Sequence, residues 1–159
     1  MAVMERREVP LDGPDLPELI RAVLERDACF RFAARGWSMG PFIRDGDVIT
    51  VAPLPEPLPG VGEVVAFVRP VPGNLVVHRV VAVRGETRLI RGDSLTGPGY
   101  EWVEPAHLLG RVIRVERNGR RIWLGLGPER YLIAAFSRLG WLAPLTRRIA
   151  RWIKPLRRC

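Results

Sequence analysis

Glycine and proline divide this chain into short segments, and their spacing restricts what it can fold into. The 159 residues include 16 Gly and 15 Pro, and many of these lie between short runs rich in Val, Ile and Leu. Short apolar runs separated by turn-forming residues are typical of strands in an antiparallel fold. We therefore expect a mainly β protein with strands at 29–34, 47–52, 63–68, 75–83, 88–91, 108–116 and 120–126.

Helical patterns flank this β region on both sides. Asp15 precedes an apolar periodic run, with Pro17 in the first turn and Glu18 at the third position, which predicts a helix over about 16–26. After Pro128, apolar and basic residues alternate in two further helical patterns, 129–140 and 141–152. We expect three parts: an N-terminal helical segment at 1–28, a β catalytic domain at 29–127 and a basic amphipathic helical tail at 128–159.

The charge of the chain is concentrated in that tail. The formal net charge is +8, yet residues 1–129 carry 17 Arg and 17 acidic residues, whereas 130–159 carry seven Arg, one Lys and no acid. A neutral folded body argues against general nucleic-acid binding, which places cations on the domain itself. The tail is either a solvated helix face or a contact for an anionic membrane surface or a partner, and we prefer contact.

The sequence also bears on where the protein works. No apolar run reaches the roughly 18 residues that span a bilayer, and the first ten residues lack the apolar core of a secretory signal. Cys29 and Cys159 follow no metal-ligand spacing and fit reduced thiols. We expect a cytoplasmic protein, peripheral on the inner face of the membrane if the tail binds lipid, with no cofactor and no metal.

Two side chains suggest chemistry. Ser38 lies at a bend between Gly36 and Gly40, and His78 lies within the run 75–81. A serine hydroxyl is a weak nucleophile unless a neighbouring base takes its proton. Lys154 is the only lysine of the chain, so a Ser/Lys pair would require the tail to fold back. If Ser38 and His78 meet in space, the protein is a peptidase.

The surrounding sequence resembles type I signal peptidases and the related self-cleaving repressor peptidases. The resemblance extends from about residue 35 to residue 115 and is carried by ordered blocks: Gly36-x-Ser-Met-x-Pro-x-Ile-x-x-Gly-Asp47, Gly62-Glu-Val-Val-Ala-Phe67, Val77-His-Arg-Val80, Arg91-Gly-Asp-Ser94 and Leu109-Gly-Arg-Val112. Bacterial-type members have lysine at the position of His78. Members of the endoplasmic-reticulum and archaeal-type branch have histidine at this position, and the sequence resembles that branch.

This resemblance implies a coiled antiparallel β domain and serine endopeptidase activity after small residues, without metal or cofactor. Ser38 matches the nucleophile and His78 the general base. Asp93 matches an acid near the base, which would orient the imidazole as the carboxylate of a serine triad does. The backbone N–H of Ser38 would help to hold the oxyanion.

Three features depart from the family pattern. Gly36 stands where many members have a second serine. The second acid that histidine-branch members carry after Gly-Asp is missing, and only Glu101 or Glu104 could replace it. The usual transmembrane anchor is also missing.

We therefore expect a signal-peptidase-like serine endopeptidase that cleaves a leader or signal segment of a peptide or protein substrate. Its site is either a Ser38/His78 dyad or a triad with Asp93 as the third member, the other role for Asp93 being that of a turn residue. The alternative is a non-catalytic repressor-like or assembly module of the same fold, whose basic tail binds DNA, a membrane or a partner. Under the first reading nucleic acid is not an expected partner.

Overall fold

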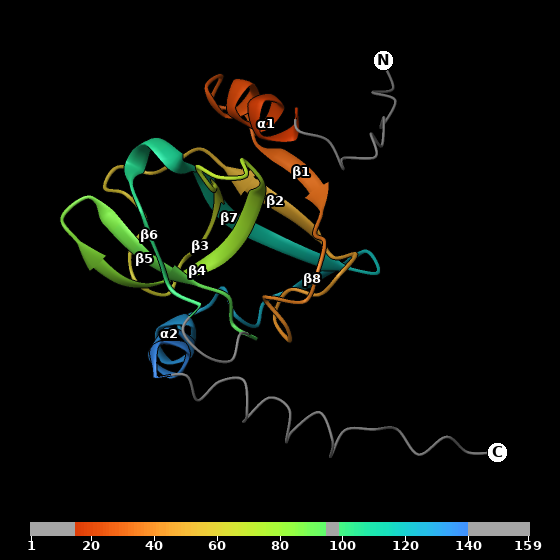
Figure 1. Cartoon of the computed structure of the whole chain (residues 1–159). Helices are drawn as coiled ribbons and strands as arrows, with labels where there is room; N and C mark the ends of the chain where they lie inside the picture. The colour runs from red at the N-terminus through yellow and green to blue at the C-terminus, as the bar shows by residue number, and fades with distance from the viewer. Residues whose placement is uncertain (1–14, 95–98, 140–159) are drawn as a thin grey trace.

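The protein is built on one antiparallel sheet with a helix at either end (Figure 1). The computed structural model describes residues 15–94 and 99–139. The elements in chain order are α1 (Leu16–Leu24), β1 (Phe30–Ala33), β2 (Val48–Ala52), β3 (Val64–Val68), β4 (Leu75–Arg84), β5 (Thr87–Arg91), β6 (Glu101–Val103), the 3-10 turn η1 (Pro105–His107), β7 (Leu108–Arg117), β8 (Arg120–Ile122) and α2 (Arg130–Arg138).

The strands are ordered β1-β2-β7-β3-β4-β5-β6, and β8 pairs with β7. All of the pairings are antiparallel. Hairpins join β3 to β4, β4 to β5 and β7 to β8, while β7 returns to lie between β2 and β3. This return brings residues 108–117 against strands formed more than forty residues earlier in the chain.

The expectation of a mainly β fold is confirmed, and the main strands lie where the turn signals placed them. One strand was missed: β6 is only three residues long and follows a turn-rich segment, so it has too few residues to show a period of two. The strand expected at 120–126 ends at Ile122, because Gly125 adopts a φ of +99° in the loop toward α2. The helix expected at 141–152 lies outside the described residues.

The core is divided between the two faces of β3. Val64 and Ala66 belong to a larger apolar cluster that also contains Ile49 of β2. Val65 and Phe67 belong to a second cluster on the other face. Alternate residues of a strand point to opposite faces, so a strand buried on both faces reads as a continuous apolar run, as β3 does.

The two helices close opposite ends of the sheet, as Figure 1 shows. In α1, Leu16, Ile20 and Leu24 recur every four residues and enter the larger cluster. In α2, Ile133 packs on Phe42 from the loop between β1 and β2. That loop carries Ser38, so α2 supports the segment on which the candidate nucleophile lies.

Candidate active site

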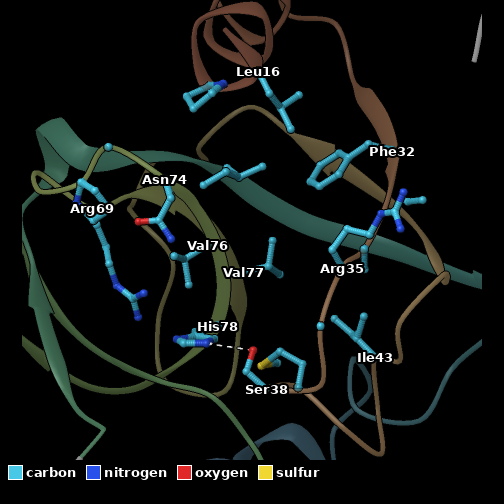
Figure 2. Close-up of a pocket in the computed structure, with 18 residues that line it drawn as sticks. Leu16, Phe32, Arg35, Ser38, Ile43, Arg69, Asn74, Val76, Val77 and His78 are labelled. Carbon is cyan, nitrogen blue, oxygen red and sulfur yellow. Dashed lines mark hydrogen bonds between the residues drawn. The ribbon is translucent and has the colours of Figure 1, made fainter. Parts of the chain in front are cut away.

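The structure brings Ser38 and His78 together. Ser38 Oγ lies 3.1 Å from His78 Nε2, and the dashed line in Figure 2 marks this hydrogen bond. Ser38 belongs to the loop between β1 and β2, whereas His78 is on β4, forty residues later in the chain. This distance is within hydrogen-bond reach, so the imidazole can take the hydroxyl proton if Nε2 is unprotonated.

The loop that carries Ser38 is closed by hydrogen bonds from its own polar residues. Gly36 has a φ of +88°, and its N–H donates to Asp45 Oδ1 at 2.8 Å. Asp47 accepts the N–H of Arg44 at 2.8 Å and two bonds from the Arg117 guanidinium of β7. Arg117 holds the pKa of the Asp47 carboxyl below its ordinary value by hydrogen bonding and charge, against the opposing effect of burial. Asp47 therefore has a structural role.

A second segment holds the Ser38 loop from the other side. The N–H of Ser94 donates to the carbonyl oxygen of Ser38 at 2.9 Å, and the Ser94 hydroxyl donates to the carbonyl of Trp37. Two consecutive carbonyls around the candidate nucleophile are thus tied to the turn that follows β5. This clamp limits the directions in which the Ser38 side chain can point.

Asp93, next to that clamp, does not contact His78. Its carboxylate accepts three hydrogen bonds from Arg79, at 2.7, 2.9 and 3.1 Å, and both side chains are completely buried. Arg79 also donates to the carbonyl oxygens of Gly62 and Gly125 at 2.8 and 2.7 Å. Burial raises the pKa of Asp93, while the charge of Arg79 opposes that effect. The ion pair thus links β4, the turn after β5, the loop at Gly62 and the loop at Gly125 close to the candidate site.

The expected third member of the catalytic group is therefore paired with the neighbour of the base. His78 and Arg79 are consecutive on β4, and consecutive side chains of a strand point to opposite faces. Asp93 lies on the face of Arg79. Among the described residues, His78 Nδ1 has no hydrogen-bond partner. The pairing seen for Asp93 supports a scaffold role rather than contact with the imidazole.

His78 is buried at the end of the groove. The residue is 3% exposed, and its ring centroid lies 6.1 Å from that of Phe67. Burial lowers the pKa of His78 to about 4, because desolvation disfavours the charged imidazolium. The imidazole is therefore neutral near pH 7 and has a free lone pair for a proton.

Glu101 and Arg69 act on the same imidazole by charge. Glu101 raises the pKa of His78 and Arg69 lowers it, both less than burial does. The two are bound to each other by a pair of hydrogen bonds, with Arg69 Nε to Glu101 Oε2 at 2.8 Å. These bonds hold the pKa of Glu101 below its ordinary value. Glu101, one of two acids that the sequence offered as a substitute, is the carboxylate that favours the charged form of His78.

A groove of about 680 Å³ extends from this pair toward α1. In Figure 2, Ser38 and His78 lie at one end and Leu16 of α1 at the other. One wall is formed by residues 32–36, at the end of β1, and the other by residues 74–78, at the start of β4. Met39 and Ile43 contribute further apolar surface beside Ser38. The groove is elongated and largely apolar.

Both walls of the groove are open strand edges in the described part of the chain. β1 pairs only with β2. β4 pairs with β3 along its whole first half, whereas its pairing with β5 begins at Arg79. Val80 N–H donates to Glu63 on the β3 side, so by strand alternation the backbone groups of Leu75 and Val77 face the groove. An extended peptide could pair with such edges.

Within the described residues there is no group of His, Cys, Asp and Glu side chains arranged to hold a metal ion. No described helix has both the length and the apolar character that crossing a bilayer requires. Comparison with protein-family profiles, with curated proteins and with solved structures found no match to this chain. The site must therefore be interpreted from its own geometry.

The sequence singled out Ser38 and His78, but it did not point to three residues that surround the candidate site: Arg79, Ser94 and Arg69. Arg79 appeared only as part of a block, and nothing in the sequence shows that it is buried. Ser94 belongs to a Gly-Asp-Ser sequence, which is common in turns and gives no sign of a contact with the Ser38 loop. Arg69 precedes a proline-rich turn and gives no signal of its own. A buried arginine can be expected only once a carboxylate such as Asp93 is known to face it, which is a tertiary property.

Proposed function

We propose that the protein is a serine endopeptidase with Ser38 as nucleophile and His78 as general base. The observation that carries this proposal is the 3.1 Å contact between Ser38 Oγ and His78 Nε2 at the end of an open groove. A serine–histidine hydrogen bond alone is common. Its position where two unpaired strand edges meet makes a peptide bond the natural reacting group.

The reaction follows from these positions. Ser38 Oγ attacks the scissile carbonyl carbon while its proton passes to His78 Nε2. The tetrahedral intermediate collapses as the imidazolium returns that proton to the leaving amine, which leaves an acyl ester on Ser38. A water molecule, deprotonated by His78, then hydrolyses the ester and restores both groups. The Ser38 N–H is our candidate for an oxyanion donor.

The substrate would bind as an added strand. Main-chain hydrogen bonds to residues 33–36 and 75–77 would supply affinity, and apolar contacts with Met39 and Ile43 would limit the side chain next to the cleaved bond. The resemblance to signal peptidases adds that small residues are preferred there and that a leader or signal segment is cleaved. The coiled form of the sheet in that family is part of the same proposal.

The direct test is cleavage of a diverse peptide library followed by mass spectrometry of the products. Wild-type protein should give a reproducible set of cleavages that Ser38→Ala and His78→Gln both abolish. His107→Gln is the matched control, because His107 lies in the short turn η1 and is not one of the described residues that line the groove. Circular dichroism should show unchanged folding. Cleavage by Ser38→Ala at the wild-type rate would end the proposal.

One observation favours a second function. Among the described residues no carboxylate touches His78, so the imidazolium lacks the hydrogen-bonded partner of a full triad. A non-catalytic module could use the same groove to hold a peptide strand without cutting it. In that case the library test would give no products, and Ser38→Ala would bind a captured peptide as tightly as the wild type.

A further inference from the structure

Helix α2 has an unusual solvent side. Its inward residues Ile133, Ala134 and Ser137 are buried. Its outward side, which we call the α2 outer face, carries the exposed Arg138 and five exposed residues that are mostly apolar: Tyr131, Leu132, Ala135, Phe136 and the C-cap residue Leu139. The exposed fractions reach 65% for Leu132 and 61% for Leu139. A surface helix normally presents polar residues on this side.

The helix is nevertheless well fixed, so this exposure is not a sign of poor packing. Ile133 packs on Phe42, and Glu129 Oε1 accepts the N–H groups of Gly125 at 2.7 Å and Gly127 at 3.0 Å just before the helix. The α1 helix of the same protein presents Glu18 and Arg21 to solvent beside the exposed Leu19 and Ala22. Its solvent side is thus more polar than that of α2.

Charge limits what can cover this face. From Arg130 to the end, the chain carries seven Arg and one Lys without an acid, and residues 1–129 have equal numbers of Arg and acidic residues. The body therefore has no excess negative charge to neutralise these cations. A second copy of the chain would bring eight like charges against eight others. A partner with a negatively charged surface and an apolar interior just below it would match both the exposed apolar side chains of α2 and the positive charge.

We propose that the α2 outer face binds the interface of an anionic lipid bilayer. Leu132, Phe136 and Leu139 would enter the boundary between headgroups and acyl chains, while the exposed Arg138 would bind a headgroup phosphate. Tyr131 fits the headgroup level, where amphipathic rings gather. This is binding to a membrane surface, and it is independent of whether Ser38 hydrolyses peptides.

The test is co-sedimentation of the full chain with vesicles of phosphatidylcholine alone or mixed with phosphatidylserine. Wild-type protein should sediment with the mixed vesicles and release as salt is raised. The variant Leu132→Ser/Leu139→Ser should partition roughly tenfold more weakly, since two exposed leucines lose their insertion. The control is Val71→Ser/Val83→Ser, which removes exposed apolar residues from the β3–β4 turn and from β4.

Each outcome decides the proposal. Equal binding by the α2 variant and the control would overturn the role of this face. Equal sedimentation with neutral and anionic vesicles would overturn the role of charge. Self-association that the α2 variant loses in the absence of lipid, with vesicle binding unchanged, would assign the face to a second copy of the chain instead. Unfolding curves of both variants should match that of the wild type.

Discussion

At the scale of single residues, the site depends on the alternation of one strand. His78 points toward the groove and Arg79 toward the opposite face, where it binds Asp93. One residue thus supplies the candidate base, and the next supports the loop that holds Ser38. A shift of β4 by one position would exchange the faces of these two side chains and place the arginine beside Ser38.

The pH dependence of cleavage should report on His78. Because burial places the pKa of His78 near 4, the imidazole stays unprotonated and able to accept a proton well below neutral pH. We expect kcat/KM to hold from pH 7 down to about pH 5 and to fall through about pH 4. A steady-state pH profile measures this, and an acid limb near the ordinary value of 6.5 would contradict the buried environment.

Glu101 and Arg69 should move that acid limb in opposite directions. Glu101→Gln removes a charge that raises the pKa of His78, so the limb should move to lower pH and the rate should fall. Arg69→Gln removes a charge that lowers the pKa, so the limb should move to higher pH. Glu104→Gln, an exposed neighbour, is the control. Parallel shifts of both variants would reject the electrostatic account.

The Arg79–Asp93 pair should behave as scaffold rather than as chemistry. Replacing either residue alone leaves a buried charge, so Asp93→Leu or Arg79→Met should lower the free energy of unfolding by about 3–5 kcal/mol. The double variant should lose less than the sum of the two single variants. Urea titrations measure these values. A stably folded Asp93→Asn should keep the acid limb of the wild type, whereas a shifted limb would restore Asp93 to the catalytic group.

At the scale of elements, the groove lies between the unpaired backbone edges of β1 and β4. The β4 strand is ten residues long, while β5 covers only its second half. The first half is therefore a free edge facing the end of β1 across the groove. Free edges attract other strands, and here the edge lies beside Ser38, the candidate nucleophile of the proposed peptidase.

Backbone methylation of a cleaved peptide should reveal this pairing. An added strand bonds each neighbour through alternate residues, so N-methyl groups that face residues 75–77 of β4 should block cleavage at every second position. The intervening N–H groups would face residues 33–36, so methylation there tests pairing with the other wall, and methylation of substrate residues beyond the groove is the control. Rates measured by liquid chromatography would contradict strand addition if all positions were equally tolerant.

The crossing of β7 between β2 and β3 requires Gly110. A Cβ at this position would meet Val51 Cγ1 at 2.6 Å and collide with the carbonyl oxygen of Ala52. Gly110→Ala should therefore destabilise the protein by about 1–3 kcal/mol through overpacking. Gly60→Ala is the control, since its Cβ would meet only Glu63, at 4.0 Å. Equal urea midpoints for the two variants would show that the β2–β7 contact is looser than described.

At the scale of the whole molecule, a neutral body is joined to a cationic end. The ion pairs of the described body include surface pairs such as Arg31–Glu116 and the buried Arg79–Asp93 pair. Surface pairs contribute little to stability, about 0–1 kcal/mol each. Folding is therefore driven mainly by the two apolar clusters on either side of β3.

Stability should decline on the acid side of neutrality. The folded pKa of His78 is depressed, so its contribution is complete above about 6.5 and is lost as pH falls through about 4. Asp47 and Glu101, whose pKa values are also lowered, act in the same direction at more acidic pH, whereas the raised pKa of Asp93 acts against them. The urea concentration at the unfolding midpoint should decrease as the pH is lowered below 6.5. This decrease should be less steep for the His78→Gln variant, provided that it folds. A flat profile from pH 7 to pH 4 would contradict the burial of His78.

The sequence by itself determined the mainly β class of fold and singled out the two side chains of the candidate site, Ser38 and His78. Turn residues and alternating apolar runs are local signals, so they placed most strands, α1 and the bend at Ser38 without any knowledge of distant contacts. The excess of positive charge after residue 129 can likewise be found by counting residues in the sequence. Local signals could not decide the partners of buried polar groups. Only the tertiary structure paired Asp93 with Arg79 and set Glu101 against Arg69, because those partners depend on strand register and on the face each side chain takes.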